Sequence, residues 1–138
     1  MGKQHNEYGK KLMKKVAGST YTEHGSKVQI DYGAGKPARI DGTIGESIAV
    51  EVESRVAKQI RGAVLDLICH RNPKKLLVIL PVHASNPEIA AEQCRNALAR
   101  FVRKTDFRVV VTKGSGDNPA LEKDVEKVGN TLRELGWR

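Results

Sequence analysis

Three carboxylates lie close together in one short stretch of the sequence, "ARIDGTIGESIAVEVESRVAKQ" at residues 38–59. Asp41 belongs to the first of two short β-like segments, and Glu51 and Glu53 belong to the second. A carboxylate is costly to remove from water unless a proton, a cation or hydrogen-bond donors meet it. The first question about this chain is therefore what meets these side chains when it folds.

The pairing of the two segments follows from their apolar faces. Alternate apolar residues mark one face at 40–44 and one face at 48–52. A two-residue turn would put the apolar face of one segment on the opposite side of the hairpin from that of the other. A three-residue loop at 45–47 puts both apolar faces on the same side. With that loop, Asp41 falls directly opposite Glu51.

Directly opposed side chains lie about 5 Å apart at Cβ, where like charges are destabilising. Two carboxylates at that spacing can share a proton or chelate a hard cation such as Mg²⁺, which proteins usually hold with one or two carboxylates. The alternative is a wet polar face with Asp41 in solvent, which helices on both sides of the sheet would disfavour. The same register sets Arg39 opposite Glu53.

Hydrophobic periodicity predicts the elements that position these residues. Short connections make the first three strands antiparallel, and strand–helix–strand units make the later strands parallel. We expect an α/β fold with a mixed β-sheet flanked by helices, forming one domain over residues 1–138. The predicted order is helix (8–18), strands (27–33, 38–44, 47–53), helix (54–72), strand (75–82), helix (86–101), strand (107–112) and helix (117–135).

Two helix starts carry a capping signal. Asn86 with Pro87 suits the beginning of one helix, and "DNPA" at 117–120 repeats the pattern. The apolar stripe of the first of these helices extends to Phe101, which is therefore expected in the core.

The net charge is +8, and the N-terminal part carries most of it. Residues 1–40 contain eight Lys and Arg against three acidic residues, which predicts either a solvated helix face or a phosphate-binding surface. A basic chain favours an anionic partner such as nucleic acid. The lysines expected to contact DNA are Lys10, Lys11, Lys14, Lys15 and Lys36.

Asp41 followed by Glu51-Val52-Glu53, on a hairpin between two helices, resembles the active-site motif of the PD-(D/E)XK nuclease superfamily. That superfamily includes many type II restriction endonucleases and archaeal Holliday junction resolvases. Its shared core is α-β-β-β-α-β. The order predicted for about residues 5–82 is similar to this core. The resemblance implies a restriction endonuclease-like fold.

By this resemblance Asp41 and Glu51 correspond to metal ligands. Glu7 corresponds to an acidic residue that holds a metal-bound water in some members, and Gln59 to a DNA-contacting Gln in a subset. Glu53 departs from the pattern, which usually has Lys at that position. Lys58 is a candidate stand-in for orienting the attacking water.

The implied function is Mg²⁺-dependent hydrolysis of DNA phosphodiester bonds, with Mn²⁺ as a possible substitute. Cutting both strands of a duplex requires two active sites, so a homodimer of the restriction type is expected, with Arg39 near the phosphate. A Holliday junction resolvase and a non-catalytic DNA-binding module on a decayed nuclease fold are the alternatives. No organic cofactor is expected.

The remaining features place the protein in a reducing, cytoplasmic setting. Cys69 and Cys94 have no spacing typical of a disulfide framework, and with His70 and His83 they match no standard zinc pattern. No apolar run reaches the roughly 20 residues of a membrane span, so no membrane partner is expected.

Overall fold

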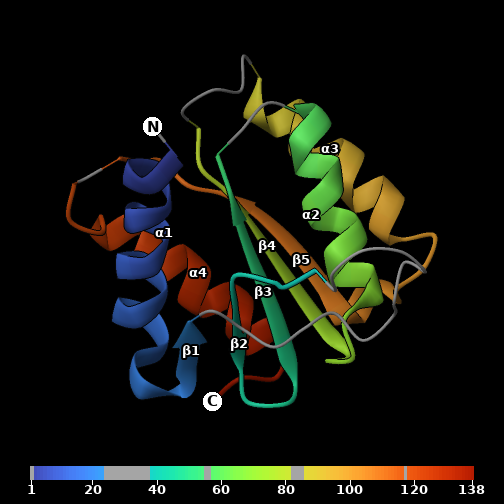
Figure 1. Cartoon of the computed structure of the whole chain (residues 1–138). Helices are drawn as coiled ribbons and strands as arrows, with labels where there is room; N and C mark the ends of the chain where they lie inside the picture. The colour runs from blue at the N-terminus through green and yellow to red at the C-terminus, as the bar shows by residue number, and fades with distance from the viewer. Residues whose placement is uncertain (1, 24–37, 55–56, 82–85, 117) are drawn as a thin grey trace.

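A computed structural model shows a β-sheet between two pairs of helices (Figure 1). The structure describes residues 2–23, 38–54, 57–81, 86–116 and 118–138, and it leaves out the side chains of residues 2–6 and 57–59. The described helices are α1 (Gly2–Ala17), α2 (Ala57–Cys69), α3 (Pro87–Leu98) and α4 (Glu122–Glu134), with short 3₁₀ turns η1 (Gly18–Thr20) and η2 (Lys104–Asp106). The described strands are β1 (Tyr21–Glu23), β2 (Gly42–Ile44), β3 (Ile48–Glu53), β4 (Lys74–Ile79) and β5 (Phe107–Val111).

The sheet is mixed, as predicted. Its strand order is β1-β2-β3-β4-β5. Strands β1, β2 and β3 pair antiparallel, and β3, β4 and β5 pair parallel. The antiparallel part follows from short connections, and the parallel part from the crossover helices α2 and α3.

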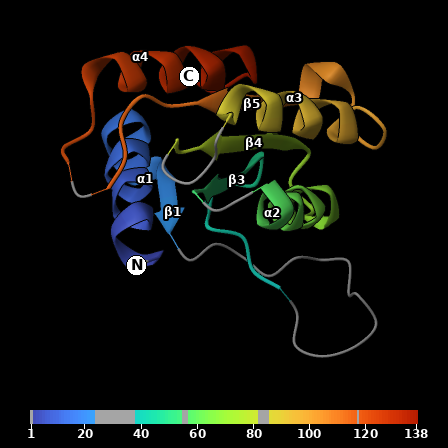
Figure 2. The same ribbon diagram turned by 90° about the horizontal axis from the view of Figure 1, so that it is seen from above.

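Each face of the sheet carries its own apolar core. Helices α1 and α4 cover one face, and α2 and α3 cover the other, as the view from above shows (Figure 2). Along β4, Leu76 and Val78 point to the α1 and α4 side, and Leu77 and Ile79 to the α2 and α3 side. Strand β3 is buried along its whole length, so its two glutamates are enclosed as well.

The N-terminal strands differ from the prediction. The strand predicted at 27–33 lies outside the described residues, and β1 occupies Tyr21–Glu23, which the sequence did not predict. The strand predicted at 38–44 covers only Gly42–Ile44. Ile40 packs in the α2 and α3 core rather than beside Ile44, because the chain bends at Asp41 and the alternation breaks there.

The cap signals had different outcomes. Asn86 caps α3 as predicted, since its side chain accepts a hydrogen bond from Ile89 N at 3.2 Å. The start predicted at 117–120 was wrong, because α4 begins at Glu122 and the Asn118 amide donates to Ser115 O instead. The prediction for Phe101 was also wrong: α3 ends at Leu98, and this ring is 72% exposed.

A buried carboxylate connects the two ends of the chain. Asp124 is 1% exposed and accepts hydrogen bonds from Lys113 N and Gly114 N, both at 2.9 Å. It also accepts from the Tyr8 hydroxyl at 2.5 Å. Burial and this bond to Asp124 raise the pKa of Tyr8 to about 12. One side chain of α4 therefore holds both the loop after β5 and helix α1.

Removing this carboxylate should destabilise the protein more than any exposed change on α4. We expect Asp124→Ala to lower the free energy of unfolding by roughly 3 kcal/mol, because two buried donors and one part-buried donor lose their acceptor. Urea denaturation followed by circular dichroism measures the change. Glu126→Ala, an exposed carboxylate on the same helix, is the control and should change stability by less than about 0.5 kcal/mol. Equal effects of the two substitutions would contradict this role.

Candidate active site

The β2–β3 hairpin brings Asp41 and Glu51 together. The structure pairs Ile44 with Ile48 and Gly42 with Val50, which confirms the predicted register and its three-residue loop. Asp41 N donates to Glu51 Oε1 at 2.7 Å. Val52 N donates to Asp41 Oδ2, also at 2.7 Å. Glu51 thus accepts a hydrogen bond from the backbone of Asp41, just before β2, and Asp41 accepts one from the backbone of β3, which holds the two groups side by side.

The electrostatics of this pair favour a bound positive charge. Burial raises the pKa of Glu51 to about 9, with further increases from the charges of Asp41, Asp66 and Glu53 and an opposing decrease from the hydrogen bond of Asp41 N. A carboxyl group with that pKa is protonated at neutral pH. Backbone N–H donors therefore meet both carboxylates, and solvent also reaches Asp41, which is exposed. For the buried Glu51, a proton is one way to neutralise the remaining charge, and a cation is the other.

Tyr21 and Asp66 belong to this neighbourhood, although the sequence did not point to either. Burial raises the pKa of Tyr21, followed by the negative charges of Asp41, Glu23 and Glu51. The Tyr21 ring lies so close to Gly42 that a Cβ there would be 2.3 Å from its hydroxyl oxygen. The signal that could have identified Tyr21 is the β-forming "YTE" at residues 21–23, separated from Gly18 by two residues.

Glu53 lies at the end of β3 and is 5% exposed. Its Oε1 accepts from Ser54 N at 3.1 Å, and its carbonyl accepts from Leu80 N at 2.9 Å. Arg39, expected opposite Glu53, forms an isolated β-bridge and is exposed. The second glutamate of β3 is therefore enclosed, next to the point where β4 ends.

The other predicted site residues are more dispersed. Glu7 pairs with Lys10 on the surface of α1, with 3.8 Å between Oε1 and Nζ. No group of three or more His, Cys, Asp or Glu residues is arranged to hold a metal ion among the residues that the structure describes. The side chains of Lys58 and Gln59, and the whole of Lys36, lie outside those residues.

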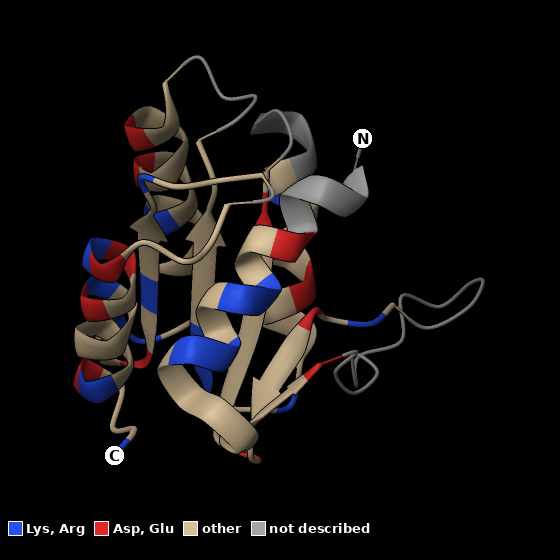
Figure 3. Cartoon of the chain, turned by 90° about the vertical axis from the view of Figure 1, so that its left-hand side faces the viewer, with Lys and Arg blue, Asp and Glu red and all other residues tan. Residues whose placement is uncertain are grey.

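Four of the predicted lysines lie on helix α1, whose ribbon carries Lys-coloured bands in Figure 3, and Lys10 among them is half-buried. Lys14 pairs with Glu23 of β1 at 3.1 Å, and Lys11 and Lys15 are exposed. The opposite side of α1 packs on β3, where Gly9 contacts Val52. The basic helix face therefore lies one helix diameter from the strand that carries Glu51.

Comparisons with models of known families, with curated proteins and with solved structures gave no match. Within the described residues, no helix combines the length and the apolar character that crossing a bilayer requires.

The raised pKa of Glu51 predicts a pH dependence of stability. Between about pH 4.5, the ordinary value, and about pH 9, the folded state holds a proton that the unfolded state releases. Stability should therefore fall as the pH rises through this window. Glu51→Gln keeps the acceptor for Asp41 N and removes the titration, so its melting temperature should exceed that of wild type increasingly from pH 5 to pH 9.

Thermal denaturation in a chelating buffer at several pH values measures this difference. Glu46→Gln is the control, because that carboxylate is on the same hairpin but has a 90% exposed side chain. Parallel pH profiles for wild type and Glu51→Gln would show that Glu51 ionises normally.

Proposed function

We propose that this chain is a metal-dependent DNA endonuclease with a restriction endonuclease-like fold, related in type to the PD-(D/E)XK nucleases and acting as a homodimer. The observation that carries the proposal is the pairing of Asp41 with Glu51 on a hairpin that precedes α2. The element order from α1 to β4 agrees with the core of that superfamily.

The donor set fits a hard divalent cation. Asp41 and Glu51 provide carboxylate oxygens, the ligands that Mg²⁺ and Mn²⁺ prefer. Burial of Glu51 and the nearby charge of the exposed Asp41 make ionisation of Glu51 unfavourable without a cation, as its raised pKa reflects. The same residues would hold the ion, with water and a phosphate oxygen of the substrate completing its shell.

When bound, the ion supplies Lewis acidity toward the phosphoryl oxygen and lowers the pKa of an attacking water. Glu51 must lose its proton for this binding, so binding strengthens as the pH rises toward about 9. Arg39, exposed beside the hairpin, is the candidate for offsetting charge on the phosphate. Glu53 and Lys58 are the candidates for orienting the water.

A non-catalytic DNA-binding module is the second candidate. Glu53 stands where the superfamily usually has Lys, and the backbone hydrogen bonds of Asp41 and Glu51 give these carboxylates a structural role of their own. A Holliday junction resolvase is the alternative within the enzyme class. The substrate of the cleavage assay distinguishes these possibilities.

The decisive substitutions are Asp41→Asn and Glu51→Gln, because a neutral amide is a poor ligand for Mg²⁺. Each should abolish cleavage while leaving DNA affinity in a chelator unchanged or higher. Glu53→Gln should remove most activity if that carboxylate acts on the water, and otherwise leave activity intact. Cleavage of supercoiled plasmid and of a four-way junction, with and without Mg²⁺, provides the measurement.

Glu46→Gln is the matched control and should cut at the wild-type rate. Plasmid that stays intact while the junction is cut would assign a resolvase. An Asp41→Ala protein that still cuts normally in Mg²⁺ would falsify this site.

The basic face of α1 is proposed to contact the DNA backbone. Replacing Lys10, Lys11, Lys14 and Lys15 by Ala should weaken duplex binding. It should also reduce the slope of log affinity against log salt by about 0.9 for each lysine that contacts a phosphate. Fluorescence anisotropy at several salt concentrations measures both effects.

The control removes the same charge elsewhere, through Ala at Lys113, Lys123, Arg133 and Arg138, all exposed. If both quadruple variants lose affinity equally, net charge rather than the α1 face explains the binding.

A further inference from the structure

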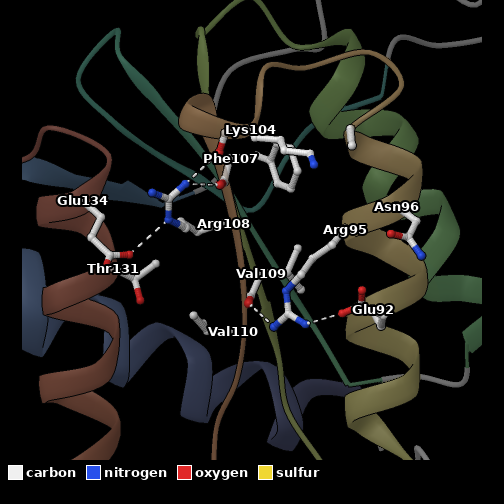
Figure 4. A pocket seen from close by; sticks show the side chains of 11 residues that line it. Glu92, Arg95, Asn96, Lys104, Phe107, Arg108, Val109, Val110, Thr131 and Glu134 are labelled. Atoms are coloured by element: carbon white, nitrogen blue, oxygen red, sulfur yellow. Dashed lines mark hydrogen bonds and ion pairs between the residues drawn. The ribbon is translucent and has the colours of Figure 1, made fainter.

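A groove of about 490 Å³ follows β5, the edge strand of the sheet, between α3 and α4 (Figure 4). Strand β4 separates β5 from β3, so this groove is distinct from the Asp41 and Glu51 pair. Neither Asp41 nor Glu51 lines the groove, so the proposed nuclease activity does not account for its charged lining.

Cationic side chains donate hydrogen bonds to every second backbone carbonyl oxygen along β5. The bonds are from Arg108 Nη1 to Phe107 O at 2.7 Å, from Arg95 Nη2 to Val109 O at 2.9 Å, and from Lys127 Nζ to Val111 O at 2.8 Å. A peptide strand that added to this edge would have to displace all three charge-assisted bonds. These bonds therefore disfavour a peptide strand and favour a ligand that the cations themselves can bind.

Both arginines of the groove are held in place by ion pairs, and Arg108 uses three of its five N–H donors in bonds to described residues. Arg95 pairs with Glu92 at 3.2 Å, and Arg108 pairs with Glu134 at 3.1 Å, as Figure 4 shows. The bonds of Arg95 to described residues use two of the five N–H donors of a guanidinium. Two preordered guanidiniums in one groove suit the oxygens of phosphate groups, although the two glutamates reduce the net charge.

One end of the groove meets a basic turn that carries an exposed aromatic ring. Lys104 lines the groove, and the same turn contains Arg100, Arg103 and Phe101, all exposed. Phe101 N and Val102 N donate to Leu98 O at 2.9 and 2.8 Å, which fixes the turn and leaves the 72% exposed ring in solvent.

The carboxylate nearest in sequence to this turn is already neutralised. Asp106 pairs with Lys74 at 2.7 Å, and the hydrogen bond from that amine holds its pKa below the usual range. The turn therefore combines one accessible π-face with three cations. Aromatic rings beside a positively charged groove are how proteins bind unpaired bases without sequence preference.

We propose that the groove along β5 and the turn at 99–104 bind single-stranded nucleic acid. A base stacks on Phe101, and the phosphates of neighbouring nucleotides contact Lys104, Arg108 and Arg95. In this proposal the groove binds one single-stranded nucleic acid, and the Asp41 and Glu51 pair on the β2–β3 hairpin takes no part in that binding.

The test uses the full-length protein with Asp41→Asn, in a chelator, so that neither metal nor cleavage enters the measurement. A fluorescently labelled ten-residue oligothymidine and a blunt duplex are the probes, read by anisotropy. Phe101→Ala should weaken oligothymidine binding by about five- to a hundredfold and leave duplex binding unchanged. Phe101→Trp should retain binding, and its fluorescence should be quenched by the oligonucleotide.

The matched control is Ile89→Ala, which removes an exposed apolar side chain from α3, 56% exposed, away from the turn. It should bind as the parent does. Unchanged oligothymidine affinity in Phe101→Ala, or an equal loss in Ile89→Ala, would overturn the proposal. Binding to anionic lipid vesicles that depends on Phe101, without oligonucleotide binding, would also overturn it and assign the turn to membranes. Because the readout is binding alone, it is independent of whether Asp41 and Glu51 support catalysis.

Discussion

The register of the β2–β3 hairpin is the constraint on which the candidate active site depends. Because side chains alternate along a strand, a shift of one residue would turn Glu51 and Glu53 toward α1 and α4 and turn the valines of β3 away from them. Two features hold the register: the short loop at 45–47, and the ring of Tyr21, which leaves room only for glycine at position 42. The carboxylate pair is thus a consequence of how β1, β2 and β3 pack.

The parts of this arrangement that were predictable are those specified by several signals at once. Loop length and two apolar faces agreed on the hairpin register, and the crossover helices required parallel strands. The failures occurred where one local signal stood alone. Alternation predicted that Ile40 shares a face with Ile44, but the chain bends at Asp41 and the two side chains enter different cores. Helical periodicity predicted that Phe101 is buried, but α3 ends at Leu98. Asp66 reaches the site through tertiary packing, which no local pattern encodes, whereas Tyr21 lies on a short β-forming segment that local propensity could have indicated.

Helix α1 connects the basic surface with the carboxylate pair. Its outer side carries the lysines, and its inner side packs on Val52 so closely that a Cβ at Gly9 would lie 2.4 Å from Val52 Cγ1. Val52 N in turn donates to Asp41. The packing of α1 on Val52 therefore fixes the position of a backbone group that donates to a candidate metal ligand.

The bond between Tyr8 and Asp124 also bears on how the chain folds while it is being made. The two residues are 116 positions apart in sequence. At ordinary rates of translation, on the order of ten seconds separate their synthesis. During that interval Tyr8, Leu12 and Met13 of α1 lack the residues of α4 that complete their core. The part of the α1 face that α4 covers therefore stays without its partner in the nascent chain until α4 has been synthesised.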